Sequence, residues 1–196
     1  MNADGTNQRN LSRNALTEEH PWWSHDGSRI LFCSDRTRKG EKDPNEDIFE
    51  MHADGTEVCQ ITRTPEGETY ASWSPDGSRI VCRRVYGDGN WEVVLLDAKG
   101  RLINNLSQHP APDAWPVWTP DGTKIIFASL RSGASRIYEI KPDGTGLRML
   151  TPKDGNWDDR QPAISPDGKT LFFARYRWFP GARYEASQIY WTVLQS

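Results

Sequence analysis

Short apolar runs bounded by turn residues recur along the chain, and they predict strands rather than helices. The clearest are the runs at 30–32, 80–82, 125–127 and 171–173. Each one follows an Asp-Gly turn, which suits a tight hairpin because glycine adopts positive φ without steric cost. The runs are apolar at consecutive positions, a pattern typical of strands that are buried on both faces. We therefore expect an all-β chain built from stacked sheets.

The same order of strands and turns repeats four times. The turn has the form Ser/Thr-x-Asp-Gly, and its aspartates are spaced by 50, 45 and 46 residues: Asp26, Asp76, Asp121 and Asp167. A second glycine turn recurs in phase with it, at 3–6, 53–56, 98–101 and 142–145. A period of this length without helical segments is typical of propeller blades. We expect a single β-propeller domain over 1–196 with four four-stranded blades, in units of about 13–62, 63–107, 108–151 and 152–196.

The two ends of the chain together supply one complete unit of the repeat. The last unit ends after its third strand, at 188–193, while the chain begins with a segment that resembles a fourth strand, at 8–12. We expect residues 1–12 to complete the last blade and to close the ring, which removes a free sheet edge. The alternatives are a segment of a longer propeller, or chains that associate into a larger ring. A monomer is the expected state.

Two segments carry a family resemblance. Trp-Ser-Pro-Asp-Gly-Ser-Arg-Ile-Val at 73–81 and Ile-Tyr-Glu-Ile-Lys-Pro-Asp-Gly-Thr at 137–145 resemble the WD-type propeller repeat of the TolB family. Similar repeats occur in prolyl-oligopeptidase-like peptidases, tricorn-type proteases and some polysaccharide lyases, so the resemblance implies a propeller scaffold rather than one chemistry. It also implies a bacterial, periplasmic protein. Localisation stays open, because residues 1–10 do not resemble a signal peptide and Cys33, Cys59 and Cys82 are odd in number.

Composition excludes several classes of function. The 24 Lys and Arg nearly balance the 27 Asp and Glu, and no long basic run is present, which argues against a nucleic-acid partner. No apolar stretch approaches the roughly 18 residues of a membrane span, so we expect no membrane insertion. No Gly-x-Ser-x-Gly elbow, phosphate-binding loop or Cys/His pair suggests catalysis, and we expect no enzymatic activity.

Repeated residues before each Asp-Gly turn are the first candidate site. An acidic residue stands six positions before each Ser or Thr of the turn: Glu18, Glu68, Asp113 and Asp159. Two positions further on are the residues His20, Tyr70, Trp115 and Gln161. In a propeller these loops converge on the central channel, where carboxylates would suit a hard cation or a protonated amine and rings would stack on a ligand. The alternative is that both sets tie and pack the blades.

A long loop in the fourth unit is the second candidate. It is basic and aromatic, and it contributes Arg175, Arg177, Trp178, Arg183 and Tyr184. In a closed ring it would lie beside the long charged loop at 34–46. We therefore expect a non-enzymatic scaffold that binds a protein, a peptide or a small ligand on this face, with no cofactor beyond a cation at the channel mouth. The alternative is an enzyme or enzyme-associated propeller, a carbohydrate-active lyase or a peptidase gating domain, with a metal held by the acidic ring and His20.

Overall fold

The computed structural model describes residues 4–36, 45–153, 155, 157–177 and 187–194. These residues form fifteen strands in four antiparallel sheets, and the described part contains no helix. The first sheet is β1 (Glu18–Trp23), β2 (Arg29–Ser34), β3 (Asp47–His52) and β4 (Cys59–Gln60), and the second is β5 (Gly67–Trp73), β6 (Arg79–Val85), β7 (Trp91–Asp97) and β8 (Leu102–Asn105). The third is β9 (Asp113–Trp118), β10 (Ile125–Ser129), β11 (Arg136–Ile140) and β12 (Arg148–Met149), and the last is β13 (Trp157–Ile164), β14 (Thr170–Arg177) and β15 (Ser187–Val193).

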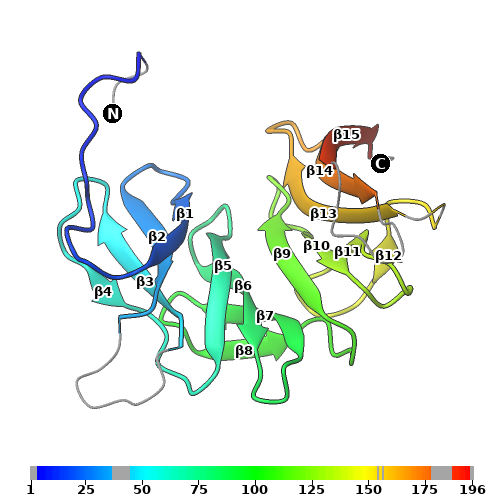
Figure 1. Ribbon diagram of the computed structural model, residues 1–196, viewed down its shortest axis with the longest axis horizontal. Coiled ribbons are helices and arrows are strands. Elements are labelled where there is room, and N and C mark those ends of the chain that lie inside the picture. The colour runs from blue at the N-terminus through cyan, green and yellow to red at the C-terminus, as the bar shows by residue number, and fades with distance from the viewer. Residues whose placement is uncertain (1–3, 37–44, 154, 156, 178–186, 195–196) are drawn as a thin grey trace.

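The sheets are arranged side by side in an arc (Figure 1). Within each sheet the strands follow one another in chain order. The first strands of successive sheets are in contact, β1 with β5, β5 with β9 and β9 with β13, so these four strands line the inner side of the arc. The all-β, propeller-type architecture expected from the repeat is therefore confirmed.

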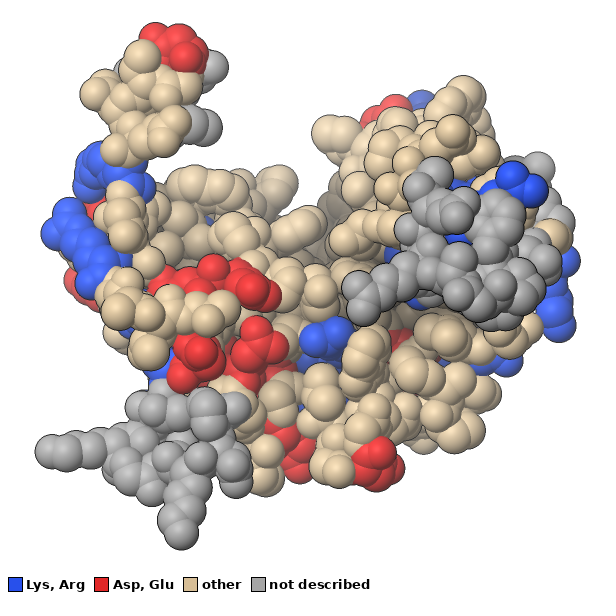
Figure 2. Space-filling model, viewed as in Figure 1, with Lys and Arg blue, Asp and Glu red and all other residues tan. Residues whose placement is uncertain are grey.

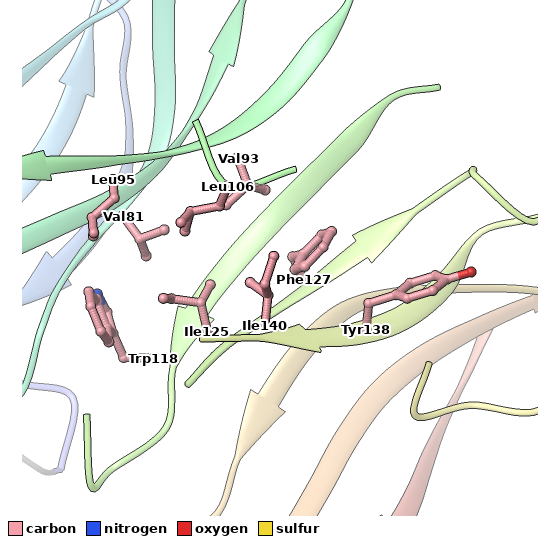
Figure 3. Packing of buried hydrophobic residues seen from close by; sticks show 9 residues of the cluster. All are labelled: Val81, Val93, Leu95, Leu106, Trp118, Ile125, Phe127, Tyr138 and Ile140. Carbon is pink, nitrogen blue, oxygen red and sulfur yellow. The ribbon is translucent and has the colours of Figure 1, made fainter. Parts of the chain in front are cut away.

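The hydrophobic core lies between neighbouring sheets. The largest cluster joins Val81, Val93, Leu95 and Leu106 of the second sheet to residues of the third, as Figure 3 shows: Trp118, Ile125, Phe127, Tyr138 and Ile140. Another joins Leu31 and Ile48 of the first sheet to Trp73 and its neighbours in the second. The consecutive apolar positions of β6 and β10 thus face two different sheets, as the sequence pattern predicts.

The expected closure of the fourth blade is not formed. Residues 8–12 are not a strand, and β15 is the edge of a three-stranded sheet in the described part of the chain. Leu11 instead packs against the first sheet, where its carbonyl oxygen lies 2.8 Å from the position a Cβ would take on Gly55. Ile61 packs on Gly100 in the same way. Ile61 follows β4, the outer strand of the first sheet, and packs on the second sheet. The N-terminal segment around Leu11 packs on the first sheet in the corresponding way.

No sheet formed by the described residues covers the two terminal faces of the arc. Trp23 is 56% exposed, whereas Trp73 and Trp118 at the same position of the next units are 4% and 7% exposed, because the preceding sheet covers them. At the other end, Phe172 is 39% exposed, while Leu31, Val81 and Ile126 at that position are fully buried. A repeat period defines the strands of each unit, but the angle between sheets depends on side-chain packing. That angle leaves the arc open.

No helix in the described residues is long and apolar enough to span a bilayer.

Candidate functional site

Four residues on the inner strands share an unusual backbone conformation. His20, Tyr70 and Trp115 each have φ of 54°, and Gln161 has φ of 51°. Each lies at a point where the pairing of its strand with the next one shifts register, which marks a β-bulge. The left-handed conformation is unfavourable for residues other than glycine and costs about 1–3 kcal/mol unless the surroundings enforce it. The bulge turns the same position of all four sheets toward the inside of the arc.

The rings at these bulges lie against one another. The centroids of His20 and Tyr70 are 3.8 Å apart, and those of Tyr70 and Trp115 are 5.9 Å apart in an edge-to-face arrangement. Together with Gln161 and the following prolines they line a cavity of about 260 Å³, which we call the channel cavity. Figure 2 shows that mostly uncharged residues border the hollow between the two ends of the arc. The structure therefore brings together the predicted aromatic set.

Three polar atoms of residues that line the channel cavity lack a hydrogen bond among the described residues. They are His20 Nδ1, Ser72 Oγ and Trp115 Nε1, all of them buried. Burial also lowers the pKa of His20, which favours the neutral imidazole. An apolar cavity with a few unpaired polar groups is typical of small-ligand and peptide sites.

The four repeated carboxylates all form ion pairs. Each pairs with an arginine of its own unit: Glu18 with Arg36, Glu68 with Arg84 at 2.8 Å, Asp113 with Arg131 at 3.1 Å, and Asp159 with Arg175 at 2.6 Å. The side chains of Glu68, Asp113 and Asp159 are fully buried. Burial raises the pKa of Glu68 and Asp113, while the neighbouring arginines oppose that shift. Among the residues described, no three His, Cys, Asp or Glu side chains are grouped so that they would hold a metal ion.

The candidates from the fourth unit fall into two groups. Arg175 forms the ion pair with Asp159, and the guanidinium of Arg177 lies 5.6 Å from the centre of the Trp157 ring. Trp178, Arg183 and Tyr184 lie outside the described residues. The first and last sheets stand at opposite ends of the arc, and most of the two long loops, at 37–44 and 178–186, lies outside the described residues.

A second pocket lies beside the channel cavity, between the second and third sheets. It has a volume of about 400 Å³ and shares Tyr70 and Trp115 with the channel cavity. Arg83, Trp91 and Arg160 also line it, and the sequence interpretation missed all three. A signal for Arg83 was present, because the same position of the other units holds Cys33, Ala128 and Ala174.

Comparisons with known proteins agree with this architecture. The family model of the TolB beta propeller domain matches residues 72–179, more than half of the chain. TolB from Acinetobacter baumannii is similar in structure, with a TM-score of 0.74 and 22% identity over 98% of this chain and 47% of that one. A TolB-like protein from Agrobacterium tumefaciens has a TM-score of 0.68 and 21% identity, over 95% of this chain and 80% of that one.

A peptidase is also among the similar structures. A puromycin-hydrolyzing peptidase from Mycobacterium tuberculosis has a TM-score of 0.68 and 18% identity, and the alignment covers 95% of this chain but 30% of the peptidase. No curated protein sequence matches the chain. Identities this low show a common fold. The chain belongs to the TolB beta propeller domain family.

Proposed function

We propose that the chain is a non-enzymatic binding module that takes a peptide, a segment of a partner protein or a small ligand into the channel cavity. The observation that carries this proposal is the left-handed bulge repeated in all four sheets, which directs His20, Tyr70, Trp115 and Gln161 into one cavity. Residues other than glycine retain this conformation only where the surroundings enforce it, and such strain is concentrated at ligand sites.

The chemistry of the channel cavity favours an apolar ligand with a few polar groups. Tyr70 and Trp115 offer ring surface, while Trp115 Nε1 supplies a donor that has no partner among the described residues. An unmade hydrogen bond of a buried donor costs about 1–3 kcal/mol, and a ligand acceptor would recover that energy. A peptide satisfies both requirements, since it carries apolar side chains and backbone carbonyls. A periplasmic location follows the family resemblance and is part of the same proposal.

Selection of peptides tests this function. Peptides chosen from a random displayed library on the wild-type chain would be measured by calorimetry against Tyr70→Gly, which suits the left-handed backbone and removes the ring. We expect binding to weaken at least about tenfold, because a buried aromatic contributes about 1.5–3 kcal/mol. Trp191→Ala is the matched control, since Trp191 lies on β15 away from the cavity and is exposed. Peptides that bind Tyr70→Gly as tightly as wild type would contradict the proposal.

The second candidate is the propeller part of an enzyme, either a peptidase gating domain or a carbohydrate-active lyase. The structural similarity to a puromycin-hydrolyzing peptidase favours it. Turnover of a fluorogenic peptide library by the purified chain, with loss of that turnover in Tyr70→Gly, would assign catalysis to the chain itself and contradict a non-enzymatic module.

A further inference from the structure

Arg83 is the exception among equivalent positions of the four units. It follows the buried apolar run of β6, where the other sheets carry Cys33, Ala128 and Ala174, all of them buried. A small side chain is thus sufficient for blade packing at this position in three of the four sheets. The long cation of Arg83 is not required by the repeat.

The guanidinium of Arg83 is held in a fixed orientation. Its carbon lies 4.7 Å from the centre of the Tyr70 ring and 4.6 Å from that of Trp91, and its Nε donates a hydrogen bond to Thr69 Oγ1 at 2.8 Å. Its two Nη atoms donate no hydrogen bond to a described residue. This arrangement pre-organises the donors that bind a carboxylate in a bidentate manner.

The charge of Arg83 is not matched by a contacting carboxylate. Arg36, Arg84, Arg131 and Arg175 each form an ion pair, whereas no described carboxylate lies within 4.0 Å of Arg83. Burial lowers the pKa of Arg83, and Glu46 acts on it only from beyond ion-pair distance. Arg83 is partly buried, and partial removal of a cation from water without a contacting anion is unfavourable, so an anionic ligand would stabilise this site.

The surroundings of Arg83 specify what the anion is attached to. The pocket is also lined by Trp115, Leu130 and Arg160, and the Arg160 guanidinium lies 5.8 Å from the centre of the Trp115 ring. Arg160 pairs with Asp158 at 3.0 Å, so its charge is partly balanced. An apolar group next to the anion would contact Trp115 and Leu130, and a volume of about 400 Å³ accommodates a group of the size of an amino-acid residue.

We propose that the pocket between the second and third sheets binds a carboxylate through Arg83, with the apolar group that carries the carboxylate resting on Trp115 and Leu130. The inference rests on the proposed function, because the pocket shares Tyr70 and Trp115 with the channel cavity. If the ligand is a peptide, its C-terminal carboxylate enters this pocket and the preceding residues lie in the channel cavity.

The test compares ligands that differ only in charge. The probes are N-acetylphenylalanine and its C-terminal amide, with galacturonic acid as a carboxylate from a sugar, each titrated by NMR. Arg83→Ala introduces the residue that the third and fourth units carry, so it is compatible with the fold. Arg83→Lys keeps the positive charge but removes the planar guanidinium that would bind a carboxylate in a bidentate manner. Arg101→Ala is the matched control, because Arg101 lies in the exposed turn between β7 and β8.

We expect wild type to bind N-acetylphenylalanine about tenfold to a hundredfold more tightly than the amide, because a hydrogen bond to a charged carboxylate is stronger than one to a neutral amide. Arg83→Ala should abolish this preference, Arg83→Lys should keep part of it, and Arg101→Ala should keep all of it. Arg83-dependent binding of galacturonic acid in place of the amino acid would support the carboxylate site and assign it to a sugar acid.

The carboxylate site would be overturned by equal binding of acid and amide to wild type, or by an acid preference that survives Arg83→Ala. In either case, binding of both probes that is lost in His20→Gly would leave the channel cavity as a binding site, because His20 lines that cavity but not the pocket with Arg83. If neither acid binds wild type at millimolar concentration while library peptides still do, the carboxylate site fails and the proposed function stands.

Discussion

Removing the guanidinium of Arg175 would leave a buried carboxylate without its counter-ion. Arg175 Nε lies 2.6 Å from Asp159 Oδ1, its Nη2 lies 2.9 Å from Oδ2, and the Asp159 side chain is fully buried. Breaking a buried pair by removing one partner costs about 3–5 kcal/mol. Since domains of this size are stable by about 5–15 kcal/mol, Arg175→Met should lose a large share of the free energy of unfolding. Urea unfolding followed by tryptophan fluorescence measures the loss, provided that the m-value is unchanged.

A double variant separates the role of the pair from the role of the site. Arg175→Met combined with Asp159→Leu removes both charges, and we expect its stability to return to within about 1 kcal/mol of wild type or above it. A loss below about 1 kcal/mol in the single variant is the range of an exposed pair and would refute the reasoning. A normal stability with weaker peptide binding would instead assign Arg175 to the ligand site, as the sequence suggested.

Three further predictions concern the bulges, the terminal face and the turns. Tyr70→Gly should be more stable than Tyr70→Ala by about 1 kcal/mol, because φ of 54° disfavours alanine, and equal urea midpoints would contradict the strain. Ile126→Ala should cost about 2–5 kcal/mol, whereas Phe172→Ala, at the same position of the last sheet, should cost clearly less because no sheet covers it; equal losses would contradict the open end. Hydrogen bonds from the two serines of its turn lower the pKa of Asp76 to about 2. Its contribution to stability is therefore present above its ordinary pKa and is lost as the pH falls from about 4 to 2. In Asp76→Asn the free energy of unfolding should fall less steeply between about pH 4 and pH 2 than in wild type. An unchanged slope would exclude Asp76 as its cause.

The hairpin turns could be predicted from the sequence because their stabilising contacts are local. In each repeated turn the aspartate accepts a hydrogen bond from the Ser or Thr hydroxyl two residues before it, as Asp26 does from Ser24 at 2.6 Å. It also accepts one from the N–H two residues after it. Five consecutive residues contain the whole interaction, so a short motif is sufficient to identify it.

The partners of the repeated carboxylates could not be predicted in this way. Arg84 and Arg175 lie directly opposite Glu68 and Asp159 in the strand register. In the first and third sheets the position opposite the carboxylate holds Ser34 or Ser129, and the arginine comes from two residues further along the chain. The ion pair repeats in space while its arginine does not repeat in sequence. The same limit applies to ring closure, which depends on the angle at which sheets pack.

The uncovered ends of the arc have a consequence for how such chains change in length. Trp73 and Trp118 each pack on the sheet before them, and Trp23 presents the same side chain at the free end. Ile126 of the third sheet contacts the fourth sheet. Phe172 is the equivalent residue of the fourth sheet, and it is exposed at the opposite end of the arc. The internal junctions thus use the same positions, with Trp73 and Trp118 at the first two and Ile164 at the third. Duplication of a unit would place these same positions against each other again, so the number of blades can change in evolution with few new contacts.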